Sequence, residues 1–235
     1  GLGDTIQYMR YIPYLINKGV NISFSAQETL HTLIKESNIH NSPIKKNESI
    51  LINSGDFLPL LSIPRYLGIN EGNVIINEPY VKSNYELSKK WKALISKNKK
   101  PIIGINWQGN PIMEKTYIGR SFPLEICSEI LKSNSVIFLS LQKGFGSEQL
   151  ETCSFKDSFV ECQKKINETW DFLETASIID NCDLIITCDT ATAHLAGAMG
   201  KEVWLLLTHI PFWTWGLKGK TTFWYPSMRL FRQER

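Results

Sequence analysis

The sequence lacks the features of several common protein classes. No apolar run reaches the roughly 20 residues that a membrane-spanning helix needs, and no signal peptide precedes the first predicted elements. The five cysteines form no C-x-x-C pair and show no zinc-ligand spacing. This pattern is typical of free thiols in a reducing compartment, so we expect a cytoplasmic protein without a structural metal.

An excess of one charge and the common catalytic motifs are also missing. The 26 basic and 23 acidic residues give a formal net charge of +3, too balanced to indicate a nucleic-acid surface or an anionic membrane partner. There is no P-loop, G-x-S-x-G, H-E-x-x-H or D-x-D motif. The Gly1-Leu-Gly3 pair has no third glycine of a dinucleotide fingerprint. We therefore predict no bound metal and no nicotinamide cofactor.

The residues that are present describe a globular α/β protein. The 235 residues, 43% hydrophobic and 21% charged, are enough for one large or two small domains. Predicted strands and helices alternate over both halves, which favours parallel sheets. The charge run and proline at 98–101 suggest a boundary, with one domain over 1–97 and a second over 98–235. The first four residues resemble a loop that follows a strand, so we expect a fragment whose first domain lacks that strand.

The clearest unit spans residues 184–207. Leu184 to Cys188 is an apolar run of strand length, 191–199 is predicted as a helix, and 202–207 as a second strand. Gly200 is placed to end the helix in a left-handed conformation. The two strands should be parallel with a right-handed crossover. Asp189 and Thr190 suit a helix N-cap.

The predicted helix has very small residues on its first two turns. A bare helix start exposes backbone amides and the positive end of the helix dipole, which favour a phosphate. Asp189 ends its strand where open α/β sheets bind ligands, and His194 follows Thr190 by one turn on the same face. The alternative is that small residues permit tight helix–sheet packing and that Asp189 is only a cap.

Three strand-exit loops should meet at one edge of the second sheet because their strands are parallel. Their amides, hydroxyls, lysine and carboxylate could hold a diphosphate and a polyol. Arg120 could reach the same edge and bind phosphate, although an isolated arginine is more often a surface residue. The loop residues in question are Trp107, Gln108, Gly109, Lys143, Asp189, Thr190, Ala191 and Thr192.

Asp4 follows Gly3 at a predicted helix start. If the two domains face each other, its carboxylate points into the space between them and could take a proton from a sugar hydroxyl. A plain helix cap is the alternative. We expect the aromatic and basic stretch after residue 211 to pack on the core. The other predicted elements are helices over 6–17, 27–36, 83–97, 124–131 and 169–181 (capped by Asn167 or Thr169), short helical pieces over 57–67, and strands or extended segments over 20–26, 50–53, 73–79, 102–107, 136–141 and 158–161.

Six segments, taken in order, resemble a known family. They are 1–7, 104–111, 120–123, 140–144, 189–201 and 224–232. Together they resemble the glycosyltransferase family 9-like domain found at the C-terminus of bacterial tetratricopeptide-repeat proteins. That domain is related to the ADP-heptose:lipopolysaccharide heptosyltransferases. The likeness spans nearly the whole chain, with Ala191 where the heptosyltransferases usually have glycine.

The resemblance implies a glycosyltransferase-B fold, with two Rossmann-like domains facing a cleft and the last segment crossing back. It implies metal-independent, inverting transfer from a nucleotide-diphosphate sugar to a glycan, a lipid-linked sugar or a protein, with at most peripheral membrane association and with repeats upstream. Asp4 matches the base, Asp189 the donor-sugar contact, and Arg120 or Lys143 the cation at the leaving phosphate. Thr190, Ala191 and His194 match the helix start that receives the diphosphate. Two alternatives stay open, a non-catalytic nucleotide- or carbohydrate-binding module and a nucleotide-sugar epimerase.

Overall fold

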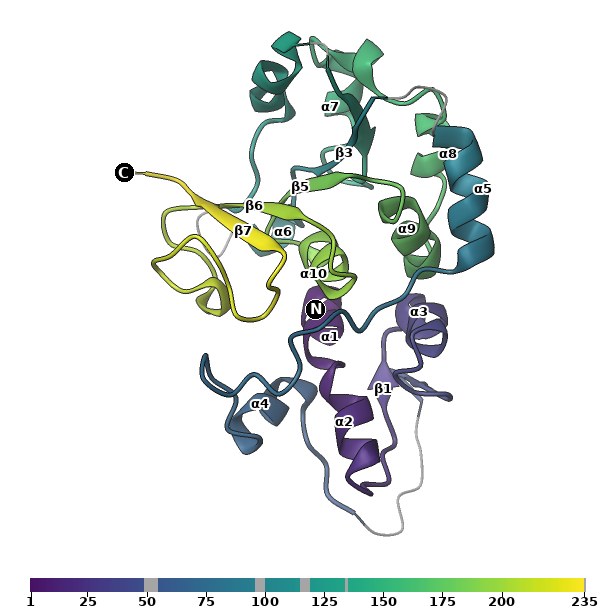
Figure 1. Ribbon diagram of the computed structural model, residues 1–235, viewed down its shortest axis with the longest axis vertical. Coiled ribbons are helices and arrows are strands. Elements are labelled where there is room, and N and C mark those ends of the chain that lie inside the picture. Colours follow the sequence, from purple (N-terminus) through teal and green to yellow (C-terminus); the bar gives the residue numbers. More distant parts are fainter. Residues whose placement is uncertain (49–54, 96–99, 115–118, 134, 235) are drawn as a thin grey trace.

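The structure is a computed structural model that describes residues 1–48, 55–95, 100–114, 119–133 and 135–234. Its larger sheet has the strand order β4-β3-β5-β6-β7 (Figure 1). Every neighbouring pair is parallel, which confirms the α/β class with a parallel sheet. The strands are β3 (Ile102–Asn106), β4 (Ile137–Ser140), β5 (Leu184–Cys188), β6 (Val203–Leu207) and β7 (Met228–Arg232).

The apolar runs of the sequence explain the centre of this sheet. All five residues of β3 are buried, and so are all residues of β5 after Leu184, because a parallel strand is covered on both faces. β7 instead alternates buried and exposed residues from Met228 to Phe231. The sequence predicted only a packed segment there. The expected strand over 158–161 is reduced to an isolated bridge between Phe138 and Phe159.

The β5–helix–β6 unit is confirmed. Along the chain, α10 (Ala191–Ala198) connects β5 to β6, which pair directly in the sheet. Gly200 follows the helix with a φ of +73°. A Cβ atom at Gly197 would lie 2.7 Å from Cγ of Tyr225. Tight packing therefore accounts for part of the small-residue pattern. The alternative interpretation of the sequence, in which small residues permit close packing of the helix, predicted this.

The first half differs more from expectation. The single helix predicted over 6–17 is wrong: α1 (Leu2–Tyr8) and α2 (Tyr11–Asn17) are separate. Pro13 explains the break, because proline has no N–H and is tolerated in the first turn of a helix. The strand predicted over 20–26 shrinks to β1 (Ser25–Ala26), whose partner among the described residues is the equally short β2 (Ile44–Lys45).

Several other predictions need correction. The helix expected over 169–181 begins later, as α9 (Phe172–Ile179), and its cap is Asp171. Asp171 Oδ1 accepts hydrogen bonds from the amides of Leu173 and Glu174 at 2.9 and 3.1 Å, whereas the Thr169 hydroxyl donates to the Ile166 carbonyl. Residues 73–79 form no strand. The segment expected over 124–131 is a 3₁₀ helix, and the strand expected over 50–53 lies outside the described residues.

The remaining described elements have 3 to 6 residues, apart from an α-helix of 11 residues over 85–95 and a 3₁₀ helix of 10 residues over 124–133. The short helical pieces predicted over 57–67 are confirmed. These elements are α3 (His31–Glu36), α4 (Ile63–Tyr66), α5 (Tyr85–Ile95), α6 (Pro111–Glu114), α7 (Gln149–Thr152), α8 (Gln163–Asn167) and the 3₁₀ helices η1 (Glu28–Leu30), η2 (Leu60–Ser62), η3 (Leu124–Ser133), η4 (Lys156–Ser158) and η5 (Trp213–Trp215).

The two halves meet where α1 packs on α10 (Figure 1). The side chain of Arg10 is buried and contacts residues of both halves. Its guanidinium lies 4.7 Å from the ring centroids of both Tyr80 and Tyr225 and donates to the Trp224 carbonyl at 2.8 Å. Trp224 and Tyr225 are buried, which confirms that much of the C-terminal segment packs on the core.

The predicted domain limits, 1–97 and 98–235, stay a prediction. α5, from the first of these ranges, packs on α9 from the second, and Lys90 Nζ lies 3.3 Å from Glu174 Oε1. Within the described ranges, no helix combines the length and the apolar character needed to cross a membrane.

Candidate functional site

A cavity of about 680 Å³, here called the main cavity, lies between α1 and the carboxyl ends of β3, β4 and β5. It collects nearly all the predicted site residues. Those that line it are Asp4, Gln108, Gly109, Arg120, Lys143, Asp189, Thr190, Ala191, Thr192 and His194. Trp107 does not line it. It is fully buried beneath the loops, and its Nε1 donates to the Gly146 carbonyl at 3.1 Å.

Gln142 ties two of the strand-exit loops together. Its Oε1 accepts hydrogen bonds from the side chain of Asn106 and from the amides of Trp107 and Gln108, at 2.8 to 3.1 Å. Its Nε2 donates to the carbonyls of Gln108 and Phe145. One buried amide therefore fixes the loop after β3 against the loop after β4.

The start of α10 is open to the main cavity. Thr190 occupies the N-cap position, but no side chain caps this helix within the described residues. The predicted capping bond is therefore wrong. The Thr190 hydroxyl instead donates to Asn106 Oδ1 at 2.7 Å, which fastens the helix start to the end of β3. Among the residues that the structure describes, no side chain accepts from the first amides of α10, as a phosphate site requires.

Arg120 crosses the floor of the same site. Its Nε lies 3.8 Å from Glu114 Oε1 and is buried without a hydrogen-bond partner in the described part of the chain. A Cβ atom at Gly109 would lie 2.5 Å from that Nε, so glycine is needed for this approach. Arg120 is therefore held at the main cavity by close packing, and its Nε donor is unpaired within the described residues.

The two other predicted basic residues are less available. Burial lowers the pKa of Lys143 to about 8, and its amine donates to the carbonyl and hydroxyl of Thr169. Burial also lowers the pKa of His194 to about 3, so its imidazole is neutral at pH 7. His194 Nδ1 lies 2.9 Å from the Tyr225 hydroxyl, and Nε2 lies 3.9 Å from Asp189 Oδ1. Whether either residue contacts phosphate stays a prediction.

Two carboxylates, Asp4 and Asp189, line the main cavity from its two sides. Asp189 is largely buried, and this burial raises its pKa; the Trp215 indole and the Arg120 guanidinium act in the opposite direction, whereas the charge of Asp4 raises it further. Asp4 is partly exposed, and its Oδ2 accepts a hydrogen bond from the Gly1 nitrogen at 2.7 Å. α1 comes close because a Cβ atom at Gly3 would lie only 2.7 Å from His194 Cδ2.

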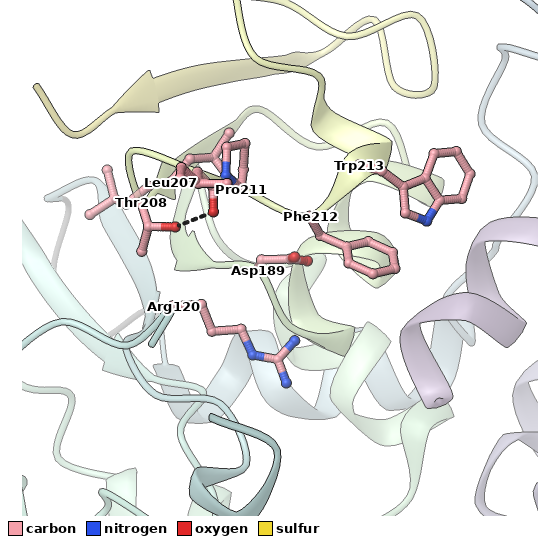
Figure 2. Close-up of a pocket in the computed structure, with 9 residues that line it drawn as sticks. Arg120, Asp189, Leu207, Thr208, Pro211, Phe212 and Trp213 are labelled. Carbon is pink, nitrogen blue, oxygen red and sulfur yellow. Dashed lines mark hydrogen bonds between the residues drawn. The ribbon is translucent and has the colours of Figure 1, made fainter. Parts of the chain in front are cut away.

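A smaller cavity of about 270 Å³, the side cavity, adjoins this site. Figure 2 shows Asp189 between Arg120 and the ring of Phe212, with the 207–213 segment above them. Arg120, Asp189 and Phe212 line both cavities. The carboxylate of Asp189 and the guanidinium of Arg120 therefore border both the main cavity and the side cavity.

Sequence reasoning missed several residues that line the main cavity. Asn106 is a buried polar residue at the end of β3. A polar residue directly after an apolar run is visible in the sequence and could have predicted this position. Trp170 is 65% exposed and comes from a loop whose position the sequence did not show. Gln7 and Thr214 come from the α1 side and from the C-terminal segment. Their placement depends on contacts between distant parts of the chain.

Comparison with known proteins gives a fold and a relative that matches over part of its length. No family model matches the chain. The chain is similar in structure to the glycosyl transferase family 9 structure from Veillonella parvula DSM 2008, with a TM-score of 0.54 over 99% of this chain and 83% of that one, at 12% identity. The chain shares that fold. The structure of E. coli ADP-heptose lps heptosyltransferase II gives a TM-score of 0.45 over 68% of this chain and 48% of that chain, at 15% identity.

A relative that matches in part is Protein FlbA from Caulobacter vibrioides. It is 28% identical over 190 residues, which cover 77% of this chain. The chain spans only 29% of the length of FlbA. The comparisons thus support the α/β fold that the glycosyltransferase resemblance implies.

Proposed function

We propose that this chain is a glycosyltransferase domain that moves a sugar from a nucleotide-diphosphate sugar to a hydroxyl acceptor, with inversion and without a metal. The observation that carries the proposal is one cavity that combines an uncapped helix start, an arginine with a free donor, and carboxylates on its two sides, within the described residues. The likeness in fold to a family 9 glycosyl transferase supports it.

The diphosphate would lie at the start of α10. The amides of Ala191 and Thr192, the helix dipole and Arg120 supply fixed positive potential to the leaving group. Lys143 is a second cation for the same end of the cavity. Asp189 would contact hydroxyl groups of the transferred sugar, and Gln108 and Gly109 would border the diphosphate.

Asp4 would act as the base from the facing side. The acceptor oxygen forms a bond to the anomeric carbon while its proton passes to Asp4. The bond from that carbon to the diphosphate oxygen breaks, and its electron pair leaves with the diphosphate. Attack from the face opposite the leaving group gives inversion. The cytoplasmic location and the upstream tetratricopeptide repeats belong to the same proposal.

A binding module without turnover is the second candidate. It is favoured by the neutral state of His194 and by the engagement of the Lys143 amine with Thr169, which leave Arg120 as the main cation presented to a leaving group within the described residues.

A donor panel tests both candidates. We expect one of the ADP-, UDP-, GDP- or dTDP-sugars to raise the melting temperature, and free nucleoside diphosphate to appear when acceptor is present. Binding without release of nucleoside diphosphate would favour the binding module. A panel without any binding would rule out both.

A further inference from the structure

Gln7 has a polar group that the protein leaves unpaired. The residue is 1% exposed, lies on α1 and lines the main cavity. Its Nε2 is buried and has no hydrogen-bond partner among the described residues. A buried donor without a partner costs free energy, so native proteins rarely keep one without a reason. Because Gln7 lines the main cavity, a ligand there would supply the missing acceptor once the side-chain amide turns toward it.

The neighbours of Gln7 indicate which kind of acceptor this is. Asp4 lies three residues earlier, so the two side chains share one face of α1, and both line the main cavity. Asp189, the second carboxylate of the cavity, senses the charge of Asp4. The carboxylate of Asp4, on the same face of α1, disfavours an anionic oxygen next to Gln7. The acceptor for Gln7 is therefore a neutral oxygen, and the diphosphate belongs near α10 and Arg120.

A hydroxyl group fits these requirements. It donates one hydrogen bond and accepts others, whereas an ionised carboxylate only accepts and the amide Nε2 only donates. Asp4 and Gln7 together thus match two neighbouring hydroxyl groups, one donating to the carboxylate and one accepting from the amide. The torsion at the end of a glutamine side chain is broad, so the amide can turn toward a ligand.

We propose that Gln7 binds a hydroxyl oxygen of the acceptor next to the hydroxyl that faces Asp4. The acceptor is therefore a sugar with adjacent hydroxyl groups, and not the single hydroxyl of a serine or threonine side chain. This inference rests on the proposed transferase function, which left glycan, lipid-linked sugar and protein open as acceptors.

Two variants separate this role from a structural one. Gln7→Met keeps the length of the side chain and removes the unpaired donor. Tyr11→Phe is the matched control, because the Tyr11 hydroxyl is also buried and unpartnered within the described residues but lines neither cavity. We expect both variants to melt at or above the wild-type temperature. A Gln7→Met variant that melts well below both other proteins would show a structural role and overturn the inference.

The binding test uses free sugars. Saturation-transfer NMR is recorded with glucose, galactose, mannose and N-acetylglucosamine, and with N-acetylserinamide as the single-hydroxyl probe. We expect a signal from at least one sugar in the wild type and in Tyr11→Phe, an affinity about tenfold weaker in Gln7→Met, and none from N-acetylserinamide. Absence of any sugar signal, or equal affinity in Gln7→Met, would overturn the inference.

A calorimetric titration with nucleoside diphosphates keeps the two proposals apart. We expect Gln7→Met to bind them as the wild type does, because the diphosphate site lies at α10. Failure of the wild type to bind any of them would refute the proposed transferase, while the sugar signal would still decide the role of Gln7.

Discussion

The wall of the main cavity that comes from the strand-exit loops is cross-linked by side-chain hydrogen bonds, whereas the facing wall from α1 carries a buried side-chain donor, that of Gln7, without a partner in the described part of the chain. Gln142 joins two loops and Thr190 binds Asn106 on the first wall. On the second wall, the donor of Gln7 is unpaired within the described chain. A pre-arranged wall suits a charged group that needs fixed dipoles. An unsatisfied wall suits a ligand that completes it.

Replacing the carboxylate of the α1 wall should have the largest effect. Asp4→Asn removes the proposed base, so we expect transfer to slow by about 10²- to 10⁴-fold with unchanged donor affinity. Transfer rates and calorimetry on the same preparation measure both quantities. Asp157→Asn, at an exposed carboxylate away from both cavities, is the control. Full turnover by Asp4→Asn would remove Asp4 as the base and with it the catalytic difference between the walls.

The cross-linked wall should depend on Gln142 as a unit. Gln142→Leu leaves the amides of Trp107 and Gln108 without their acceptor, so we expect a loss of about 2–4 kcal/mol in the free energy of unfolding and weaker nucleotide binding. Chemical denaturation and calorimetry give the two values. Gln163→Leu is the matched control, because Gln163 bonds the backbone of Ser140 at the same strand end but lines neither cavity. Equal nucleotide affinity in the two variants would show that loop order does not shape the site.

The two walls also differ in how far the sequence foretold them. The wall from the strand-exit loops follows from local patterns, since apolar runs marked β3, β4 and β5 and parallel strands bring their exit loops to one edge. The α1 wall depends on contacts between distant residues. Pro13 divided the expected helix, and Gln7 faces the main cavity because Gly3 lets α1 approach His194. Periodicity could not show that approach, and it could not show that Tyr225 would occupy the space beside Gly197.

Blocking the helix start tests whether the cross-linked wall is the phosphate site. Thr190→Trp fills the opening of α10 and removes the bond to Asn106, so we expect nucleoside diphosphates to bind about 100-fold more weakly, or roughly 2.7 kcal/mol. Calorimetry measures this affinity. Thr152→Trp places the same side chain at an exposed position of α7 and should bind as the wild type does. Unchanged affinity in Thr190→Trp would move the diphosphate elsewhere.

His194 lies where the two walls meet, and its burial predicts an acid response. Its folded pKa of about 3 lies below the unfolded value of about 6.5. The unfolded chain therefore binds a proton first as pH falls, and the stability from the neutral imidazole is present above pH 6.5 and lost below it. Between pH 7 and pH 5 we expect this residue to remove about 2 kcal/mol from the free energy of unfolding.

His194→Gln cannot titrate, so its free energy of unfolding should fall less over the same pH interval, by about that amount. Urea denaturation at several pH values measures the difference, and His209→Gln in the loop after β6 controls for the loss of an imidazole. A wild type and a His194→Gln variant with parallel pH profiles would mean that water reaches the ring. The contact between α1 and α10 would then be looser than Gly3 and Tyr225 indicate, and the α1 wall would be a movable surface instead of a fixed one.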